Sequence, residues 1–379
     1  MRPFELRLGK LFSTLKDHNV ETEKVVLQSK YALNYIFADL YSPPPEELGV
    51  FAIIIDMNTM ELDAYVSSLE YYRIVETYSY VQNLAVHPVA PSTMGIEFDT
   101  EIVDVKDMKN NIARVCKESR RISVDSNEIC GNDSSSIRID IRSIIKKIRR
   151  NKSEEEVKMI RKAIEIAEKA IEDTIPRIKN GLSEQVIAGL IESRARELGA
   201  EGFAFSTIVA IGANTSKPHH IPSSTIFRGN EPIVIDFGVR VHGYVSDITR
   251  IILPSNPQKE AGTIRDFANI ISDAIDSSIQ CLKVGERYSN IDEVARSVLM
   301  KSNIHRYFVH GLGHGIGVDV HEEPRISKAS DHEVELGDVI TIEPGIYMHK
   351  KFGIRIEDDV YVAPSRPIKL TSLRRVIEL

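Results

Sequence analysis

Short apolar runs alternate with helix-like stretches over the first 130 residues. Runs rich in β-branched residues at 25–27 and 51–55 predict strands, and the amphipathic stretch at 7–18 predicts a helix. Between residues 126 and 136 apolar residues become scarce and Ser, Asn, Asp and Gly accumulate, which is typical of a loop. We therefore expect a small α/β domain over residues 1–130, with its boundary in this loop.

A basic amphipathic helix is predicted next, within a linker at residues 131–152. Residues 138–152 hold seven Lys or Arg and one acid, and isoleucines recur at helical spacing. We interpret this segment as a connector that buries its isoleucines and solvates its charges, and not as a contact for membrane or nucleic acid. Ser153 followed by Glu156 forms a capping box, which predicts that a long helix opens a second domain at residues 153–379.

Strand-like runs dominate the second domain and continue after its later helices. Ser183 is a candidate N-cap for a helix that ends near residue 199. Strands are expected at 207–211, 233–237 and 244–253, helices at about 263–283 and 291–301, and further strands at 339–343 and 354–360. Strands and helices are thus largely segregated along this domain.

Composition and charge narrow the class of protein. The 379 residues include 42% hydrophobic residues and carry a formal charge of 48 − 55 = −7, which indicates a folded, mildly acidic protein of about two domains. The acidic balance argues against nucleic-acid binding. The longest apolar run, 50–55, is too short to cross a membrane, and the first residues carry no readable secretory signal, so a cytoplasmic location is expected.

Three cysteines, Cys116, Cys130 and Cys281, are far apart in the sequence and include no C-x-x-C pair. Their odd number and spacing argue against a disulfide framework and against a thiolate zinc site. We expect three core or surface thiols.

Acidic residues occur where apolar strands would normally exclude them. Asp236 ends an apolar run, and Asp247 follows eleven residues later, beyond a turn that contains His242 and Gly243. A hairpin would bring the two carboxylates side by side, where they repel each other and resist ionisation. Glu343 and Glu357 again place an acid in or just after an apolar strand. Bound divalent cations are the simplest explanation for four such acids.

A glycine-rich stretch, residues 310–317, adds His310 and His314 and lets the backbone approach a ligand closely. It lacks the third glycine of a dinucleotide loop, and residues 321–325 do not form an H-E-x-x-H site. Oxygen ligands with one imidazole suit Mn, Co, Fe or Zn in a two-metal cluster. Four carboxylates would neutralise two divalent ions and leave room for a bound hydroxide.

Taken together, these motifs resemble the pita-bread metallopeptidases that cleave Xaa-Pro bonds, namely the prolidases and aminopeptidases P. The resemblance extends from about residue 148 to the end of the chain, whereas residues 1–130 are similar only in being a creatinase-like α/β domain. It is carried by Lys217-Pro218-His219-His220, Asp236-Phe237-Gly238, Ser246-Asp247-Ile248-Thr249-Arg250, His310-Gly311-Leu312-Gly313-His314-Gly315, Glu343-Pro344-Gly345-Ile346-Tyr347 and Gly353-Ile354-Arg355-Ile356-Glu357-Asp358.

The resemblance implies a fold and a set of roles. The fold would be an α/β N-terminal domain followed by an α+β pita-bread catalytic domain, a curved antiparallel sheet covered by helices. Two divalent ions, with Mn²⁺ or Co²⁺ favoured over Zn²⁺ or Fe²⁺, would hold the attacking hydroxide. The implied metal ligands are Asp236, Asp247, His314, Glu343 and Glu357, with Glu343 also moving a proton.

Other residues would act around the ions. His219 and His321 would stabilise the developing charge on the scissile carbonyl, and His310 would bind substrate or support the ligands. Thr249 and Arg355 would support the ligands, with Arg355 orienting Asp236 or its neighbours. Tyr347 would help to form the proline pocket. His220 and His242 are interpreted as structural.

Substrate length stays open at this point. Arg325 resembles the residue that receives the substrate carboxylate in some prolidases, which favours an Xaa-Pro dipeptidase. The alternative for Arg325 is a surface ion pair with Glu322 or Glu323. The alternative is an aminopeptidase P that acts on longer peptides. A non-catalytic pita-bread binding module is disfavoured because all five ligand positions are filled. Relatives of this kind are commonly dimers, so a homodimer is expected, with a proline-containing peptide as substrate.

Overall fold

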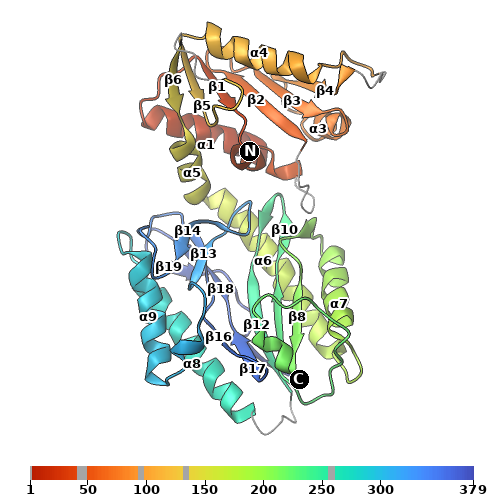
Figure 1. The fold of residues 1–379 in the computed structure, drawn as a ribbon, viewed down its shortest axis with the longest axis vertical. Coiled ribbons are helices and arrows are strands. Elements are labelled where there is room, and N and C mark those ends of the chain that lie inside the picture. The colour runs from red at the N-terminus through yellow and green to blue at the C-terminus, as the bar shows by residue number, and fades with distance from the viewer. Residues whose placement is uncertain (1, 41–48, 93–97, 131–135, 255–260) are drawn as a thin grey trace. The chain divides into compact units, whose positions relative to one another are not determined.

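The structure, a computed structural model, describes residues 2–40, 49–92, 98–130, 136–254 and 261–379. The chain forms two compact units, Met1–Arg149 and Arg150–Leu379, which are drawn in Figure 1. Each unit is described by itself below.

The first unit is an α/β domain built on a six-stranded mixed sheet with the strand order β4-β3-β2-β1-β5-β6. Pairs β1–β2 and β2–β3 are antiparallel, and pairs β3–β4, β1–β5 and β5–β6 are parallel. Its elements are α1 (Pro3–Asp17), β1 (Lys24–Leu27), α2 (Lys30–Ile36), η1 (Ala38–Leu40), β2 (Val50–Asp56), β3 (Leu62–Ser67), α3 (Tyr71–Thr77), β4 (Leu84–Val89), α4 (Val105–Glu118), β5 (Arg121–Val124), β6 (Ile137–Asp140) and α5 (Arg142–Arg150).

Strand β6 shows that the chain returns to this sheet after the predicted boundary. It pairs in parallel with β5, so the first unit extends to Arg149 instead of ending near residue 130. The basic segment predicted as one helix from residue 138 is split accordingly, because its first residues are in β6 and the helix α5 begins only at Arg142. Residues 131–135 of the predicted loop lie outside the described residues.

The expectation of three free thiols is wrong. Cys116 on α4 and Cys130, which follows β5, form a disulfide across 14 residues, while Cys281 is free. Both bonded cysteines are buried in the cluster that packs α4 against the sheet. Tertiary packing brings them together, so their sequence spacing gave no indication of the bond.

The second unit combines largely antiparallel sheets with helices. The sheet orders are β20-β12-β9-β8, β14-β13-β15-β18-β19, β11-β10-β7 and the hairpin β16-β17, and β12–β20 is the only parallel pair among the described strands of this unit. Its elements are α6 (Glu154–Thr174), η3 (Ile175–Arg177), α7 (Glu184–Glu197), β7 (Gly202–Phe203), β8 (Ile208–Ile211), η4 (Gly212–Ser216), β9 (Ile233–Phe237), β10 (Val239–Val241), β11 (Tyr244–Val245), β12 (Ile248–Leu253), α8 (Ala261–Cys281), α9 (Tyr288–Lys301), η5 (His305–Tyr307), β13 (Gly313–Gly315), β14 (Glu322–Ile326), β15 (Val339–Ile342), β16 (Gly345–Met348), β17 (Phe352–Arg355), β18 (Asp358–Val362), β19 (Pro367–Lys369) and β20 (Val376–Glu378).

Local sequence explains where the first helices of this unit begin. Helix α6 starts with the predicted capping box, in which the Ser153 side chain accepts from the Glu156 backbone and the Glu156 side chain accepts from the Ser153 backbone. Ser183 caps α7 by accepting from the Val186 N–H. Both N-cap predictions are confirmed.

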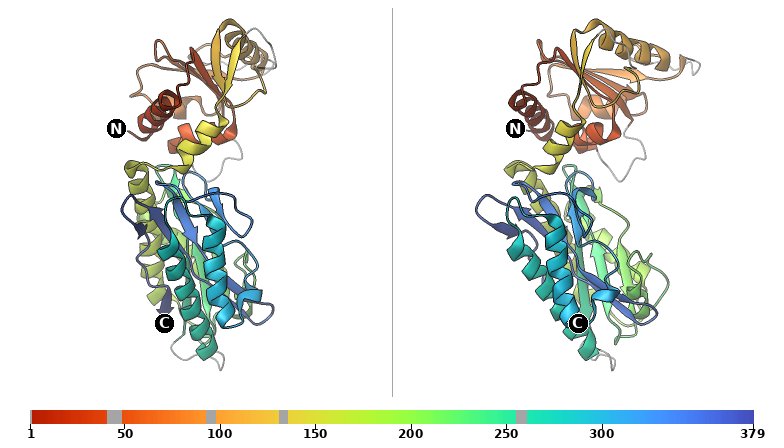
Figure 2. Two further views of the ribbon diagram at one scale, coloured as in Figure 1. Left: turned by 90° about the vertical axis from the view of Figure 1, so that its left-hand side faces the viewer. Right: turned by 60° about the vertical axis from the view of Figure 1, so that its left-hand side comes forward.

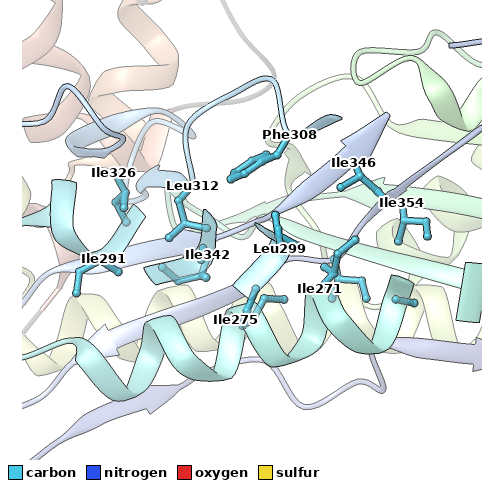
Figure 3. Close-up of a cluster of buried hydrophobic side chains, with 14 of the residues drawn as sticks. Ile271, Ile275, Ile291, Leu299, Phe308, Leu312, Ile326, Ile342, Ile346 and Ile354 are labelled. Atoms are coloured by element: carbon cyan, nitrogen blue, oxygen red, sulfur yellow. The ribbon is translucent and has the colours of Figure 1, made fainter. Parts of the chain in front are cut away.

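One apolar core cluster of the second unit lies between the helix pair α8 and α9 and the strands that face them. The two helices lie side by side in Figure 2. Figure 3 shows their apolar side chains, such as Ile271, Ile275 and Leu299, meeting Ile342 and Ile354 from the strands. The predicted pita-bread arrangement of an antiparallel sheet system covered by helices is confirmed.

Among the described residues, no helix is both long enough and apolar enough to cross a membrane.

Candidate active site

Three of the four predicted acids lie where strands are interrupted. Asp247 separates β11 from β12, Glu343 follows β15, and Glu357 separates β17 from β18, whereas Asp236 is within β9. The sequence had suggested unbroken strands at 244–253 and 354–360. In a regular strand the side chains point alternately to the two faces of the sheet. A residue at a break is free of this alternation and can direct its side chain toward the shared site.

The predicted hairpin turn is present, but its register differs from the simplest expectation. Val241 pairs with Tyr244, and His242 and Gly243 between them both have positive φ, as a two-residue hairpin loop requires. On the neighbouring strands, however, Asp236 faces Thr249 and not Asp247. Asp247 therefore approaches Asp236 from beyond the end of β12.

The acids converge on one imidazole. His314 on β13 has its Nε2 atom 3.7 Å from Asp247 Oδ2 and 3.5 Å from Glu343 Oε1. Ligand atoms of Asp247, His314 and Glu357 all lie within 4.8 Å of one another. Asp247, Glu343 and Glu357 come from strand breaks or ends and His314 from the middle of β13, so the fold gathers a compact set of oxygen and nitrogen donors.

Burial makes this cluster unfavourable in its ionised state. Burial and the neighbouring Glu357 charge raise the pKa of Asp247 and of Glu343 well above their usual range. Burial together with the Asp236 charge raises the pKa of Glu357 to about 8. Burial lowers the pKa of His314 to about 3, so its imidazole is neutral at physiological pH and its nitrogen lone pair is available to a metal.

Arg355 balances part of this negative charge. Its Nη2 donates to Asp236 Oδ2 at 2.6 Å, and its Nε donates at 3.1 Å to the Thr249 hydroxyl. That hydroxyl in turn donates to Glu357 Oε2 at 2.7 Å. Arg355 and Thr249 therefore fix the orientation of two carboxylates, and the contact anticipated between Arg355 and Asp236 is present.

The same guanidinium is linked to Tyr347 and His310. Arg355 Nη1 donates to the Tyr347 hydroxyl at 2.9 Å, which lies 3.0 Å from His310 Nε2. His310 Nδ1 faces the Gly311 carbonyl at 2.8 Å and must carry the proton there, so Nε2 accepts from Tyr347. Burial lowers the pKa of His310 to about 4 and raises that of Tyr347 to about 12, which keeps both groups neutral.

The remaining predicted residues surround this cluster with greater exposure. The His321 ring lies edge-on to the His314 ring with centroids 4.4 Å apart, and burial followed by the Arg325 charge lowers its pKa. His219 is exposed, and its charge would act on both His310 and His321. Arg325, also exposed, pairs with His314 across β13 and β14. Glu322, considered above as a partner of Arg325, pairs instead with Lys152.

The glycines of residues 310–317 serve a different purpose from the one expected. A Cβ atom on Gly313 would lie 2.0 Å from the Thr341 carbonyl oxygen, and one on Gly315 would lie 2.3 Å from the Glu323 carbonyl oxygen. At Gly313 and Gly315 the group that lies too close for a Cβ atom is the backbone of the neighbouring strands β15 and β14. These glycines let β13, which carries His314, fit between its neighbours.

Two further acids belong to the surroundings of the site and were not assigned from the sequence. Asp359 is fully buried, its Oδ2 accepts from the Asp247 N–H at 3.3 Å, and burial followed by the Glu357 charge raises its pKa. Asp358 binds Arg250 and Arg375, which lower its pKa although burial opposes this. Both follow Glu357 directly in the sequence, between apolar residues. That run of three acids could have pointed to them.

The donor set fits divalent metal. Asp236 Oδ1 is buried and has no hydrogen-bond partner among the described residues, which leaves its lone pairs available. When all four clustered carboxylates are ionised, their negative charge exceeds what the neighbouring Arg355 guanidinium neutralises. Oxygen ligands with one neutral imidazole are the donors that Mn²⁺, Co²⁺, Zn²⁺ and Fe²⁺ accept.

The raised pKa of Glu357 predicts how the stability of metal-free protein depends on pH. Between pH 4.5 and about 8 the folded state keeps a proton that the unfolded state releases, so stability falls as pH rises. The lowered pKa of His310 makes stability rise with pH instead, but only between about pH 4 and 6.5. We expect the free energy of unfolding of EDTA-treated protein to fall by about 1.5 kcal/mol between pH 6.5 and 8 from Glu357 alone.

Urea unfolding at three pH values across this interval measures the effect. Saturating Mn²⁺ should remove the decline, because metal binding favours the deprotonated ligands, and Glu357→Gln should weaken the decline without metal. A stability that is constant or rises over this interval in metal-free wild-type protein would contradict the prediction.

Comparison with known proteins identifies the class that this fold and site define. The profile of metallopeptidase family M24 matches residues 158–364, more than half of the chain. The chain belongs to this family of metallopeptidases.

Individual relatives agree with this assignment. An uncharacterized peptidase of Staphylococcus aureus (strain MW2) is 39% identical over 223 residues, which are 59% of this chain and 63% of that peptidase. The X-Pro aminopeptidase of Thermotoga maritima MSB8 is 29% identical with a TM-score of 0.78, and the alignment covers 98% of this chain and 99% of that one. The prolidase of Pyrococcus furiosus is 30% identical with a TM-score of 0.71, covering 96% and 99%.

Proposed function

We propose that this metallopeptidase hydrolyses Xaa-Pro peptide bonds and that it uses two divalent ions. The observation that carries the proposal is the cluster of three buried acids, Asp236, Asp247 and Glu357, and the half-buried Glu343 beside the neutral imidazole of His314. Two divalent ions, the Arg355 guanidinium and one bound hydroxide together balance four ionised carboxylates, whereas a single ion with that guanidinium would leave a net negative charge in the site. Similarity to a prolidase and an X-Pro aminopeptidase supports the choice of substrate.

The five residues would hold the ions, with Mn²⁺ or Co²⁺ favoured and Zn²⁺ or Fe²⁺ as alternatives. When bound, such ions supply a hydroxide at neutral pH and polarise the scissile carbonyl. The side chain of Glu343 is 18% exposed, against 7% for Asp247 and 11% for Asp236, so it is the most accessible of these three acids. We assign Glu343 the transfer of the proton between the attacking oxygen and the departing proline nitrogen.

The histidines around the cluster would bind the substrate and stabilise its transition state. His219 and His321 are accessible imidazoles next to the ligand cluster, and each can donate a hydrogen bond to the carbonyl oxygen as it gains negative charge. His310 is neutral with its Nε2 engaged by Tyr347, so it acts as a fixed wall of the site together with that ring. Tyr347 and His310 would thus shape the pocket for the proline ring.

Dipeptides are the substrates we favour. Arg325 pairs with His314 across the strands, is exposed, and offers a guanidinium fork that matches a carboxylate. A carboxylate directly after the proline exists only in a dipeptide, so use of Arg325 selects for that length. The similarity to an X-Pro aminopeptidase over nearly the whole chain supports the second candidate, an aminopeptidase acting on longer peptides.

Substrate length and the role of Arg325 can be tested together. Metal-stripped protein is reloaded with Mn²⁺, and hydrolysis of an Xaa-Pro dipeptide is compared with that of the same dipeptide extended by one residue. We expect preference for the dipeptide, and Arg325→Met should raise KM for the dipeptide by about tenfold or more while leaving the tripeptide unchanged, because one charged hydrogen bond is lost. Lys328→Met, which removes a nearby positive charge on the same segment, is the control. Preference for the tripeptide would establish the aminopeptidase instead.

A further inference from the structure

The loop that carries His219 is held by one buried carboxylate from another element. Glu184 is the first residue of α7 and is completely buried. Its Oε1 accepts from the Ile211 N–H at 2.8 Å and from the Asn214 side chain at 2.9 Å. Its Oε2 faces His220 Nε2 at 2.7 Å and accepts from Ser223 N at 2.9 Å and Ser223 Oγ at 2.6 Å.

All five contacts come from residues 211–223, the segment that contains His219. Three of these contacts come from N–H groups that can only donate, and an ionised carboxylate accepts from all five groups, whereas an amide in its place would present hydrogens to some of them. With Glu184 ionised, His220 Nε2 carries the proton in their contact. Burial opposes ionisation, yet the hydrogen bonds from His220, Ser223, Asn214 and Ile211 lower the pKa of Glu184 overall.

Both neighbours of His219 are thereby fixed while His219 itself is exposed. On one side the Pro218 carbonyl accepts from Arg355 Nη1 at 3.1 Å, and on the other side His220 is buried against Glu184. His219 lies in a turn with Pro218, and it is exposed while the next residue, His220, is buried. Arg355 also binds Asp236, so the backbone next to His219 is connected through Arg355 to the ligand cluster.

Packing and hydrogen bonds hold different parts of this loop. Thr215 and Ser216 are buried, and the Gly353 N–H donates to the Thr215 hydroxyl at 2.8 Å. Residues 211–214, at the start of the loop, line a cavity of about 400 Å³ together with Thr225, Pro232 and Phe352, so packing is incomplete there. The hydrogen bonds to Glu184 therefore fix the start of the loop, at Ile211 and Asn214, and the part that follows His219, at His220 and Ser223.

We propose that Glu184, through His220, is a positioning residue for His219 in the reaction. This inference rests on the proposed function, in which His219 donates to the carbonyl oxygen. Glu184 touches neither substrate nor metal ligand in this arrangement, and its effect on catalysis passes through the loop. Displacement of a catalytic group by about 1 Å can cost a hundredfold in rate, so a partial displacement is expected to cost about tenfold.

A double-mutant experiment separates positioning from a general structural effect. Glu184→Gln keeps the volume but turns an amide N–H toward the donors of His220 and Ser223. We expect it to lower kcat for an Xaa-Pro dipeptide by about tenfold in the wild-type background and by less than about twofold in the His219→Ala background, with unchanged Mn²⁺ affinity. Glu197→Gln, on the exposed last turn of α7, is the control. An equal fall in both backgrounds, or no fall in the wild type, would overturn the proposal.

A second measurement does not depend on activity. Carbethoxylation of His220 in metal-free protein, followed by mass spectrometry, should be slow in wild type and in Glu197→Gln and several-fold faster in Glu184→Gln. If Glu184→Gln folds poorly, Ser223→Ala removes one donor only and should change both measurements in the same direction by a smaller factor. Equal reactivity of His220 in all variants would overturn the proposal, whereas absence of Xaa-Pro hydrolysis by the wild type would contradict the proposed function instead.

Discussion

Replacing Asp247 with asparagine is expected to lower kcat/KM for an Xaa-Pro dipeptide by about a thousandfold, which corresponds to about 4 kcal/mol of transition-state stabilisation. Asp247 is buried among Glu357, Asp236 and Glu343 and lies 3.7 Å from His314 Nε2. An amide has a similar shape but no negative charge, so the cluster would lose a ligand and its charge balance with two divalent ions. Steady-state kinetics at saturating Mn²⁺ measures the loss.

The same substitution should have the opposite effect on the stability of metal-free protein. The buried carboxylates repel one another in the absence of metal, so removing one charge should raise the melting temperature of EDTA-treated Asp247→Asn above that of the wild type. Mn²⁺ should then stabilise the wild type more than the variant. Asp266→Asn, an exposed site on α8, is the control and should change neither property. A variant that is less stable without metal and equally active with it would contradict the assignment.

Replacing Lys152 with methionine is expected to destabilise the second unit by about 3 kcal/mol. Lys152 Nζ lies 3.2 Å from Glu322 Oε2, and both side chains are 1% exposed. Methionine fills a similar volume but leaves the Glu322 carboxylate buried without its cation. Glu322 also accepts from the N–H groups of Val318 and Asp319. Removing the Lys152 charge should therefore also disturb the turn that leads to His321.

Urea unfolding of metal-loaded protein measures this change. Lys162→Met on the exposed face of α6 is the matched control and should alter stability by less than about 0.5 kcal/mol, because its ion pair is on the surface. The double variant Lys152→Met with Glu322→Leu should regain much of the lost stability, since both partners of the buried ion pair are then apolar. If Lys152→Met were as stable as Lys162→Met, the buried ion pair would have no structural role.

Much of the fold could be predicted because its signals are local. The capping box at Ser153 and Glu156 and the hairpin loop at His242 and Gly243 depend on neighbouring residues only, and the structure contains both. Non-local features could not be predicted in this way. The pairing of β6 with β5 and the Cys116–Cys130 disulfide depend on which distant segments pack together, and no spacing rule records that.

The candidate site shows the same division. Acids within apolar runs drew attention to Asp236, Asp247, Glu343 and Glu357, because burying a charge without a partner is too costly to occur by chance in four strands. The glycines beside His314 gave a misleading signal, since glycine permits close approach by any backbone and the sequence does not say which one. Glu184 was missed because an acid in a first helical turn is ordinary, and only the structure shows five donors around it.

The central claim, that the buried acid cluster holds two divalent ions used to hydrolyse Xaa-Pro bonds, is tested most directly by titration of metal-stripped protein. Mn²⁺ is added in known equivalents while hydrolysis of an Xaa-Pro dipeptide is followed. We predict no hydrolysis without metal and a rise that levels off at two equivalents of tightly bound ion per chain. Hydrolysis that survives exhaustive chelation, or a plateau at one equivalent, would contradict the account.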